Sequence, residues 1–491
     1  MMQLNDLLKG VEVLELKGPT DASILELVFD SRKVKNQSCF FAQRGTQVDG
    51  HQFIEAAIKD GATAIVCEEF PNSHDEKITY IKVANSAKAL GISAANFYGQ
   101  STSKLKLVGV TGTNGKTTTV TLLHQLFTEL GHHTGLISTV VNKIGKEEVK
   151  STHTTPDAIQ LNQLFARMVE SGCEYCFMEV SSHAVAQDRI AGLHFAGGVF
   201  TNITHEHLDF HKTFEHYLQA KRMFFNMLPK NAFALSNKDD KNGTVMLQET
   251  QAKKSFYALK TQADFKAKLI ESNFEGIQLK VDGQDFWSSL IGSFNAYNLT
   301  AVYATARLLA QDKLEVLTVL SNLKAVAGRF QHINIGGVIG IVDYAHSPDA
   351  LENVLSTIKN IRKGTEEVIT VVGCGGDRDK TKRPVMASIA CQLSNRVILT
   401  SDNPRTEDPE VIINEMKQGV DAASKRKVLA ITGREEAIRT AVALAQPGDI
   451  LLIAGKGHET YQEINGVRNH FDDLEIVVAA LNENFNSKLA K

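Results

Sequence analysis

Residues 112–118 combine glycine, threonine, asparagine and lysine in a pattern suited to holding phosphate groups. The run Gly112-Thr113-Asn114-Gly115-Lys116-Thr117-Thr118 follows an apolar stretch, Leu105 to Val110, and opens an amphipathic pattern. A strand, a glycine turn and a helix N-terminus in this order direct backbone N–H groups and the helix dipole at an anion. Lys116 would reach the β- and γ-phosphates, and the Thr117 hydroxyl would ligate Mg²⁺. The general phosphate-loop motif has glycine where Val110 stands. An ordinary strand–helix turn with a stray lysine fits this context less well. We therefore predict a nucleoside triphosphate site.

Further along the chain, one side chain is suited to bind a metal ion, and two others are suited to bind a nucleobase. Glu179 stands at the end of an apolar run, Tyr175 to Val180. Ligands of parallel sheets collect at the carboxyl ends of the strands, so Glu179 is expected to be a second Mg²⁺ ligand. Asn295 and Asn298 lie about one helical turn apart, an arrangement suited to an adenine edge.

A histidine-rich loop offers a rival hypothesis. The run His205-x-His207-x-Asp209-x-His211 nearly matches the motif of dinuclear zinc hydrolases of the metallo-β-lactamase type, but its third histidine lies one residue too far along. A zinc hydrolase would also have no need of a phosphate loop. A switch protein driven by nucleoside triphosphate is a third possibility, although it would not need anchoring groups in the flanking regions.

The elements that must position these residues indicate an α/β protein. A length of 491 residues suggests about three domains. Residues 1–100 are expected to form a small α/β domain, in which Asp30-Ser31-Arg32 follows a strand, either in contact with a ligand or in a solvated loop. Residues 101–330 alternate strands and helices, which predicts a mostly parallel sheet. Residues 331–491 repeat this alternation, which predicts a doubly wound, Rossmann-like domain. Polar runs, including Gly455-Lys456-Gly457-His458-Glu459, follow its strands.

Composition excludes several other classes of protein. The chain has 53 basic and 56 acidic side chains and a net charge of -3, which gives no support for nucleic-acid binding. No apolar run reaches the roughly 18–20 residues of a membrane span, and the first residues lack an export signal. Six cysteines are too few for a disulfide framework, and Cys173 and Cys176 read as half-buried thiols rather than a redox pair. We expect a cytoplasmic protein.

Several motifs taken together resemble those of the Mur ligases, the ATP-dependent amide-bond-forming enzymes of peptidoglycan precursor synthesis. The motifs are Gly112-Thr113-Asn114-Gly115-Lys116-Thr117, Met178-Glu179-Val180-Ser181-Ser182-His183, His207-Leu208-Asp209-Phe210-His211, Asn295-x-x-Asn298 and Asp343-Tyr344-Ala345-His346-Ser347-Pro348. They span nearly the whole chain in the family's order and spacing. Two departures, Ala184 and Glu206, leave the charged groups of the mechanism unchanged.

The resemblance implies a substrate pair. The chain looks like the ligase that adds an amino acid to UDP-MurNAc-L-Ala-D-Glu, and the run Asp402-Asn403-Pro404-Arg405 is similar to that of the branch that adds meso-diaminopimelate. The resemblance implies that Mg²⁺ is a cofactor. It also implies that ATP is a substrate, which activates the D-glutamate γ-carboxylate as an acyl phosphate. The alternatives are L-lysine as the added amino acid, or a ligase similar to folylpolyglutamate synthase. We expect a monomer.

The resemblance also implies roles for individual residues. Lys116, Glu179, His207 and Lys221 match catalytic positions, with a second Mg²⁺ near His207 and with Lys221 carbamylated; without the resemblance, Lys221 would read as a surface lysine on an amphipathic helix. The other matching positions bind UDP (Ser31), the sugar-peptide arm (Thr154, Thr155, Ser181, Gln187, Arg189), adenine, ribose and phosphate (Asn295, Asn298, Arg329, Asp343) and the amino acid (Arg378, Asp402, Asn403, Pro404, Arg405, Gly455, Glu459).

Overall fold

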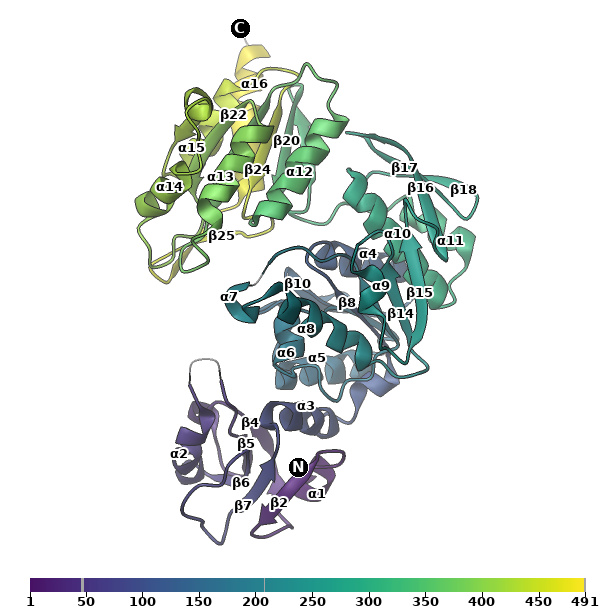
Figure 1. Ribbon diagram of the computed structural model, residues 1–491, viewed down its shortest axis with the longest axis vertical. Helices are drawn as coiled ribbons and strands as arrows, with labels where there is room; N and C mark the ends of the chain where they lie inside the picture. The colour runs from purple at the N-terminus through teal and green to yellow at the C-terminus, as the bar shows by residue number, and fades with distance from the viewer. Residues whose placement is uncertain (46–47, 207, 490–491) are drawn as a thin grey trace. The chain divides into compact units, whose positions relative to one another are not determined.

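A computed structural model describes residues 1–45, 48–206 and 208–489 of the chain (Figure 1). The chain divides into two compact units. The first unit comprises Met1–Asn202, Glu215–Tyr257 and Ala304–Gln311, and the second comprises Ile203–Phe214, Ala258–Tyr303 and Asp312–Lys491.

The N-terminal part of the first unit contains a five-stranded sheet. Its order is β2 (Val13–Lys17), β7 (Thr79–Val83), β6 (Ala62–Cys67), β5 (Ser38–Phe41) and β4 (Glu26–Val28). Strands β4 to β7 run parallel, and β2 pairs antiparallel with β7. The remaining elements are β1 (Met2–Gln3), β3 (Ser23–Ile24), α1 (Leu4–Leu7), α2 (Ile54–Lys59), α3 (Ser86–Phe97) and the short helices η1 (Ser31–Lys33), η2 (Gly50–Phe53) and η3 (Ser101–Lys104).

The rest of the first unit is built on a larger sheet. Its strand order is β11 (Glu147–Lys150), β10 (Val141–Ile144), β9 (Thr134–Ile137), β12 (Tyr175–Glu179), β8 (Lys106–Thr111), β13 (Gly197–Phe200), β14 (Phe233–Asn237) and β15 (Lys253–Ala258). All neighbours from β9 to β15 are parallel. The helices are α4 (Lys116–Glu129), α5 (Ala158–Glu170), α6 (Ser182–Ala186), α8 (Phe214–Asn226) and α9 (Gly243–Met246). Because β8, β12 and β13 are adjacent and parallel, their carboxyl ends share one edge of the sheet.

The second unit begins with an antiparallel meander and two helices. The strands are β16 (Phe265–Asn273), β17 (Gly276–Val281) and β18 (Gln284–Ser288), and the helices are α7 (Leu208–His211), α10 (Ser293–Leu308) and α11 (Lys313–Leu320). The alternation expected for this region did not predict the meander.

The C-terminal part of the second unit is a six-stranded sheet with helices on both faces (Figure 1). Its order is β19 (Gln331–Ile335), β20 (Val338–Asp343), β24 (Ile450–Ala454), β21 (Val368–Cys374), β22 (Arg396–Ser401) and β23 (Val428–Ala430), parallel except for β19. One face packs on α12 (Pro348–Ile361), α13 (Lys382–Leu393) and α14 (Pro409–Lys417), and the other on α15 (Arg434–Leu444) and α16 (Asp473–Leu489). Residues alternate between the two cores, as Val372 and Val371 show.

The predicted α/β class with mostly parallel sheets is confirmed. The alternation expected after residue 331 is present, while the antiparallel edge strand β19, the hairpin β25 (Tyr461–Ile464) and β26 (Val467–His470), and the short helix η4 (Ser424–Lys427) were not expected. Within the part of the chain that the structure describes, no helix combines the length and apolar character of a membrane span.

Candidate active site

The phosphate loop joins β8 to α4 as predicted, and its glycines are required by its backbone. Gly112 has φ of +151°, and a Cβ there would lie 1.9 Å from the Thr201 hydroxyl oxygen. Gly115 precedes α4 in a left-handed conformation, with φ of +87°. Neither position accepts a side chain without strain or collision. The loop therefore brings its backbone close to the neighbouring strand and opens directly into a helix N-terminus.

The end of β13 holds this loop in place. Asn202 accepts from the backbone N–H of Thr113 through its carbonyl (2.8 Å) and from the N–H of Asn114 through its side-chain oxygen (3.0 Å). The Thr201 hydroxyl donates to the Asn114 carbonyl at 2.6 Å. The Thr113 hydroxyl lies 3.0 Å from the Tyr217 hydroxyl of α8. These anchors were not predicted, although a threonine and an asparagine directly after an apolar run offered a signal.

Two lysines meet at one carbonyl of the phosphate loop. Lys116 Nζ donates to the carbonyls of Gly112 and Thr113, each at 2.8 Å, and Lys221 Nζ donates to the same Gly112 oxygen at 2.8 Å. Lys221 lies on α8, is 1% exposed, and its Nζ lies 4.6 Å from the ring centre of Tyr217. The alternative of a plain surface lysine at position 221 is therefore wrong. Two like charges that share an acceptor repel one another, so this corner of the loop is suited to anionic partners.

Glu179 ends β12 at the same sheet edge and is 1% exposed. Its Oε1 accepts from the Thr139 N–H at 2.8 Å, and the Thr139 hydroxyl donates to Thr154 at 3.0 Å. Its Oε2 is buried and has no hydrogen-bond donor among the described residues. A buried carboxylate oxygen without a donor is costly unless a cation binds it, so this atom fits the predicted Mg²⁺ ligand.

The residues predicted for the sugar-peptide arm form one network. They are Thr154, Thr155, Ser181, Gln187 and Arg189. The Thr155 hydroxyl donates to the Glu179 carbonyl at 2.7 Å and accepts from the Ser181 N–H at 3.1 Å. Arg189 donates to the Thr155 carbonyl at 2.8 Å and to the Gln187 side chain at 2.6 and 3.0 Å. Burial lowers the pKa of Arg189. The structure therefore joins this group to the Glu179 strand end.

Ser31 lies apart from this network. It begins the short helix η1, which Asp30 caps by accepting from the Arg32 N–H at 3.1 Å. The Arg32 guanidinium pairs with the Asp30 carboxylate at 2.9 Å, and this pairing lowers the pKa of Asp30. Among the residues in the described ranges, no hydrogen bond joins Ser31 to Thr154 or Thr155.

The residues predicted to bind adenine and ribose lie in the second unit. Asn295 and Asn298 are buried on α10, where Asn298 Nδ2 donates to Asn295 Oδ1 at 3.0 Å. Asp343 ends β20 and accepts from the Phe330 N–H at 2.6 Å; burial raises the pKa of this carboxyl, and Arg329 opposes the rise. The Phe294 ring of α10 lies 5.7 Å from the Phe330 ring, which brings the asparagine helix beside the Arg329–Asp343 segment.

The Asp402–Arg405 run follows β22 and contacts the segment Gly375–Arg378, which follows β21. Arg405 has φ of +52° and donates from Nη1 to the Gly376 carbonyl at 2.7 Å. A Cβ on Gly375 would lie 3.0 Å from Arg405 Nη1 and 4.0 Å from Arg378 Cγ, so both arginines flank this glycine. The Gly376 N–H donates to the Asn403 carbonyl at 2.9 Å, and a Cβ on Gly376 would collide with the Pro404 carbonyl at 1.9 Å.

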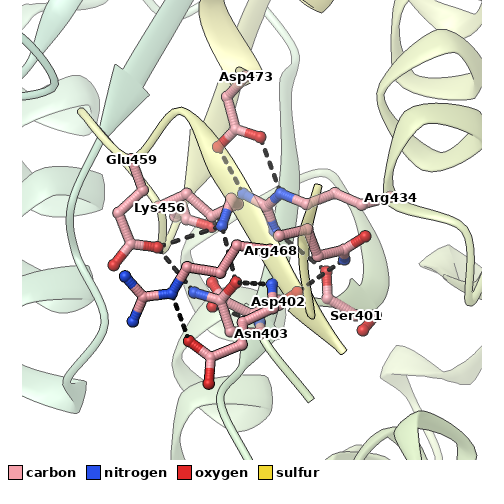
Figure 2. Close-up of polar contacts among 11 residues, drawn as sticks. Ser401, Asp402, Asn403, Arg434, Lys456, Glu459, Arg468 and Asp473 are labelled. Carbon is pink, nitrogen blue, oxygen red and sulfur yellow. Dashed lines mark hydrogen bonds and ion pairs between the residues drawn. The ribbon is translucent and has the colours of Figure 1, made fainter. Parts of the chain in front are cut away.

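Carboxylates gather where β22 and β24 end (Figure 2). A Cβ on Gly455 would lie 2.6 Å from Asp402 Oδ2, so glycine is needed there. Asn403 Nδ2 donates to Glu459 Oε2 at 2.7 Å. Burial and Asp402 raise the pKa of Glu459, whereas Lys456 and Asn403 lower it. The seven residues predicted for the amino acid therefore lie where β21, β22 and β24 end.

A fully buried ion pair supports these strand ends and was not predicted. Arg434 of α15 and Asp473 of α16 are 0% exposed side chains and pair at 2.7 and 2.8 Å (Figure 2). Arg434 also donates to the Ala454 carbonyl at 3.0 Å and to the Ser401 carbonyl at 3.5 Å, the last residues of β24 and β22. Nothing in the sequence separates this arginine, in the first turn of its helix, from arginines on a solvent-exposed helix face.

The metal hypotheses rest partly on His207, which lies outside the described residues. Of its neighbours, the His205 ring packs on Phe214 with centroids 4.7 Å apart. Among the residues the structure describes, no group of three or more histidine, cysteine, aspartate and glutamate side chains is arranged to hold a metal ion.

Fold and site together define an α/β enzyme that binds a nucleoside triphosphate: a glycine turn at a helix N-terminus, two lysines at its carbonyl, and a buried carboxylate at the next strand end. Family models agree with this class. The Mur ligase middle domain matches residues 110–306, the glutamate ligase domain of Mur ligases matches 328–457, and the Mur ligase catalytic domain matches 24–98.

Individual proteins match over nearly their full length. A UDP-N-acetylmuramoyl-L-alanyl-D-glutamate–2,6-diaminopimelate ligase from Cytophaga hutchinsonii is 58% identical, covering 97% of this chain and 98% of the relative. A solved structure of a ligase of the same name is 33% identical, with a TM-score of 0.71, covering 98% of this chain and 99% of that one. A MurF ligase from Thermotoga maritima in complex with ADP is 20% identical, with a TM-score of 0.61 and coverage of 94% and 98%, a likeness of fold alone. The chain belongs to the Mur ligase family.

Proposed function

We propose that this chain is the ATP-dependent ligase that adds meso-diaminopimelate to the D-glutamate γ-carboxylate of UDP-MurNAc-L-Ala-D-Glu in peptidoglycan precursor synthesis. The observation that carries the proposal is the 58% identity, over 97% of the chain, to a ligase named for these two substrates. The convergence of the Asp402–Arg405 run with Glu459 supports the choice of amino acid, because it gathers both signs of charge in one place.

The chemistry requires a carboxylate to become an acylating agent. The γ-carboxylate attacks the γ-phosphate of ATP to give an acyl phosphate and ADP, and the amine of the amino acid then displaces phosphate to form the amide. Both steps bring anions together, so catalysis consists of positioning and charge neutralisation. Lys116, at the helix N-terminus, would bind the β- and γ-phosphates by exchanging its bonds to the loop carbonyls for bonds to phosphate oxygens.

One Mg²⁺ would be held by Thr117 and by Oε2 of Glu179, which has no hydrogen-bond donor among the described residues. A second Mg²⁺ would bind near His207, and Lys221 would ligate Mg²⁺ as its carbamate. When bound, the metal supplies positive charge at the phosphates. An unmodified ammonium has no lone pair for a metal, whereas a carbamate is a carboxylate on a long arm. Carbamylation would also remove the repulsion between Lys221 and Lys116 at the Gly112 carbonyl.

The other predicted contacts complete the substrate assignments. Arg189 and its network partners would hold the sugar-peptide arm, which places the γ-carboxylate near the Glu179 strand end, and Ser31 would contact the UDP end. Asn295, Asn298, Arg329 and Asp343 would bind adenine and ribose. We assign these roles to three domains, residues 1–100, 101–330 and 331–491, in a cytoplasmic monomer.

The experiment is ATP-dependent phosphate release with UDP-MurNAc-L-Ala-D-Glu, compared across meso-diaminopimelate, L-lysine and L-ornithine. Of the three amino acids, only meso-diaminopimelate is expected to support turnover. Equal turnover with L-lysine would move the assignment to the lysine-adding reaction, and turnover with a folate acceptor in place of the UDP-sugar would favour the folylpolyglutamate synthase alternative.

A further inference from the structure

Lys456 is a buried lysine beside the predicted amino-acid site, and the proposed reaction gives it no role. It lies two residues after the end of β24, and its side chain is 0% exposed. Its Nζ donates to Asn403 Oδ1 and to Glu459 Oε2, each at 3.1 Å (Figure 2). A buried ammonium is costly unless it is paired and hydrogen-bonded, so these two contacts are strongly specified by the fold.

The first contact determines which way the Asn403 amide points. Asn403 Oδ1 accepts from Lys456 Nζ at 3.1 Å and from the Glu463 N–H at 2.9 Å, while Nδ2 donates to Glu459 Oε2 at 2.7 Å. A reversed amide would set its NH₂ group against two donors and its oxygen against a carboxylate. Because an amide nitrogen carries two hydrogens, this orientation leaves one N–H of Asn403 for an anionic group of a ligand.

The second contact sets the charge and direction of Glu459. Oε2 of this carboxylate accepts from both Lys456 and Asn403, which leaves Oε1 for a ligand ammonium. Burial and Asp402 raise the pKa of Glu459, and Lys456 opposes them by charge and by hydrogen bonding. The charged and titratable groups that act on Glu459 are Asp402, Lys456, Arg434, Arg468, Tyr344 and Tyr461.

We propose that Lys456 is a positioning residue for a zwitterionic amino-acid head group, acting through the Asn403 amide and the Glu459 carboxylate. The inference rests on the proposed function. Arg378, Arg405 and Lys456 supply positive charge, and Asp402 and Glu459 supply negative charge. A pocket with both signs of charge matches a head group that carries one ammonium and one carboxylate, such as the far end of meso-diaminopimelate. A lone ammonium, such as the end of a lysine side chain, would leave the guanidinium without its carboxylate.

The test compares Lys456→Met, which keeps the length of the side chain and removes its charge, with the parent full-length enzyme. At about pH 7 we expect the KM for meso-diaminopimelate to rise about tenfold or more, the loss typical of a charged hydrogen bond. The KM values for ATP and for the UDP-sugar-dipeptide should stay unchanged. Without Lys456, Glu459 should be protonated in a larger fraction of molecules, so the ratio of variant to parent KM should fall as the pH rises toward about pH 9.

Lys427→Met is the matched control. Lys427 is a half-buried lysine of the same domain that donates to the Ser394 and Cys391 carbonyls, away from the predicted amino-acid residues. It should leave the KM for meso-diaminopimelate unchanged. If Lys427→Met raises this KM as much as Lys456→Met does, or if Lys456→Met raises all three KM values together at every pH, Lys456 has only a structural role.

A Glu459→Gln background keeps the test decisive if Lys456→Met alone does not fold. There the ammonium has lost its carboxylate partner and keeps only its bond to Asn403, so adding Lys456→Met should raise the KM by less than it does in the parent. A further tenfold loss in this background would overturn the proposal.

A parent enzyme that releases no phosphate with meso-diaminopimelate would overturn the proposed function instead. Normal turnover by the parent, together with an unchanged KM in Lys456→Met, would overturn only the role of Lys456.

Discussion

At the scale of single residues, Lys116 is the most direct test of the phosphate loop. Lys116 is half-buried and its Nζ donates to the Gly112 and Thr113 carbonyls, so its loss removes little packing and Lys116→Ala should leave the chain folded. Loss of charge stabilisation of this kind typically costs about 3–4 kcal/mol, so turnover should fall by roughly 10²–10³-fold. Steady-state phosphate release, with circular dichroism as the folding control, measures this effect. Near-normal activity would contradict the phosphate-loop assignment.

Lys221 tests the predicted modification. Lys221→Ala should be nearly inactive, and short carboxylic acids added to the assay should restore part of the activity because they return a carboxylate to the position of the carbamate. Intact mass of the parent protein, measured under gentle conditions in the presence of bicarbonate, should show the added carbamate. An active preparation whose Lys221 carries no modification would argue against this prediction.

Arg405 should select the amino acid. A guanidinium pairs with a carboxylate through two charge-assisted bonds, and L-lysine lacks that carboxylate and ends in a lone ammonium. Breaking a desolvated pair costs on the order of 3–5 kcal/mol, so Arg405→Ala should reduce use of meso-diaminopimelate by at least about a hundredfold. The KM for ATP should change little. If the KM for ATP rises while the preference over L-lysine survives, Arg405 contacts ATP instead.

At the scale of elements, Arg383 joins α13 to α14 and to the segment after the Asp402–Arg405 run. Its buried guanidinium pairs with Glu407 at 2.9 Å and with Glu415 at 2.6 Å. The bond from Arg383, together with the Asp377 N–H and Lys380, lowers the pKa of Glu407 from 4.5 to about 2. Because the folded-state pKa is depressed, the stabilisation is complete above about pH 4.5 and is lost as the pH falls toward 2.

Glu407→Gln should therefore lower the free energy of unfolding at neutral pH by about 1–3 kcal/mol, because a charged hydrogen bond is weakened while Glu415 still pairs with Arg383. The difference from the parent should shrink below about pH 4.5. Denaturant unfolding across this range measures it. Glu435→Gln, which breaks an exposed pair with Arg439, is the control and should change stability by less than about 1 kcal/mol. A pH-independent difference for Glu407→Gln would refute the linkage.

The helices and strands also show which parts of the fold could be predicted from the sequence. Apolar runs bounded by polar turns located the strands of the doubly wound sheet because burial on both faces leaves a continuous apolar signal. The β25–β26 hairpin is short and mostly exposed, so it gave no such signal, although its Ile464 pairs with Arg405. Local pattern could predict the Gly112–Thr117 turn, whereas Arg434 acts through contacts between distant segments, which a single sequence does not reveal.

At the scale of the whole molecule, all six cysteines are free and buried. Burial raises the pKa of thiols such as Cys39, Cys176 and Cys374, which makes the reactive thiolate rare. A thiol reagent should therefore label the native chain slowly and label six positions once the chain is unfolded. Rapid native labelling of Cys173 and Cys176 together would revive the rejected redox interpretation of that pair.

The left-handed backbone of Arg405 has a consequence for the history of the position. A φ of +52° is unfavourable for any residue with a Cβ, by about 1–3 kcal/mol, and glycine would adopt it freely. A glycine would thus relax the turn and delete the guanidinium in a single change. Selection for higher stability favours glycine at this position, whereas selection for substrate specificity favours arginine. The presence of arginine in a strained conformation indicates that specificity has been the stronger constraint here.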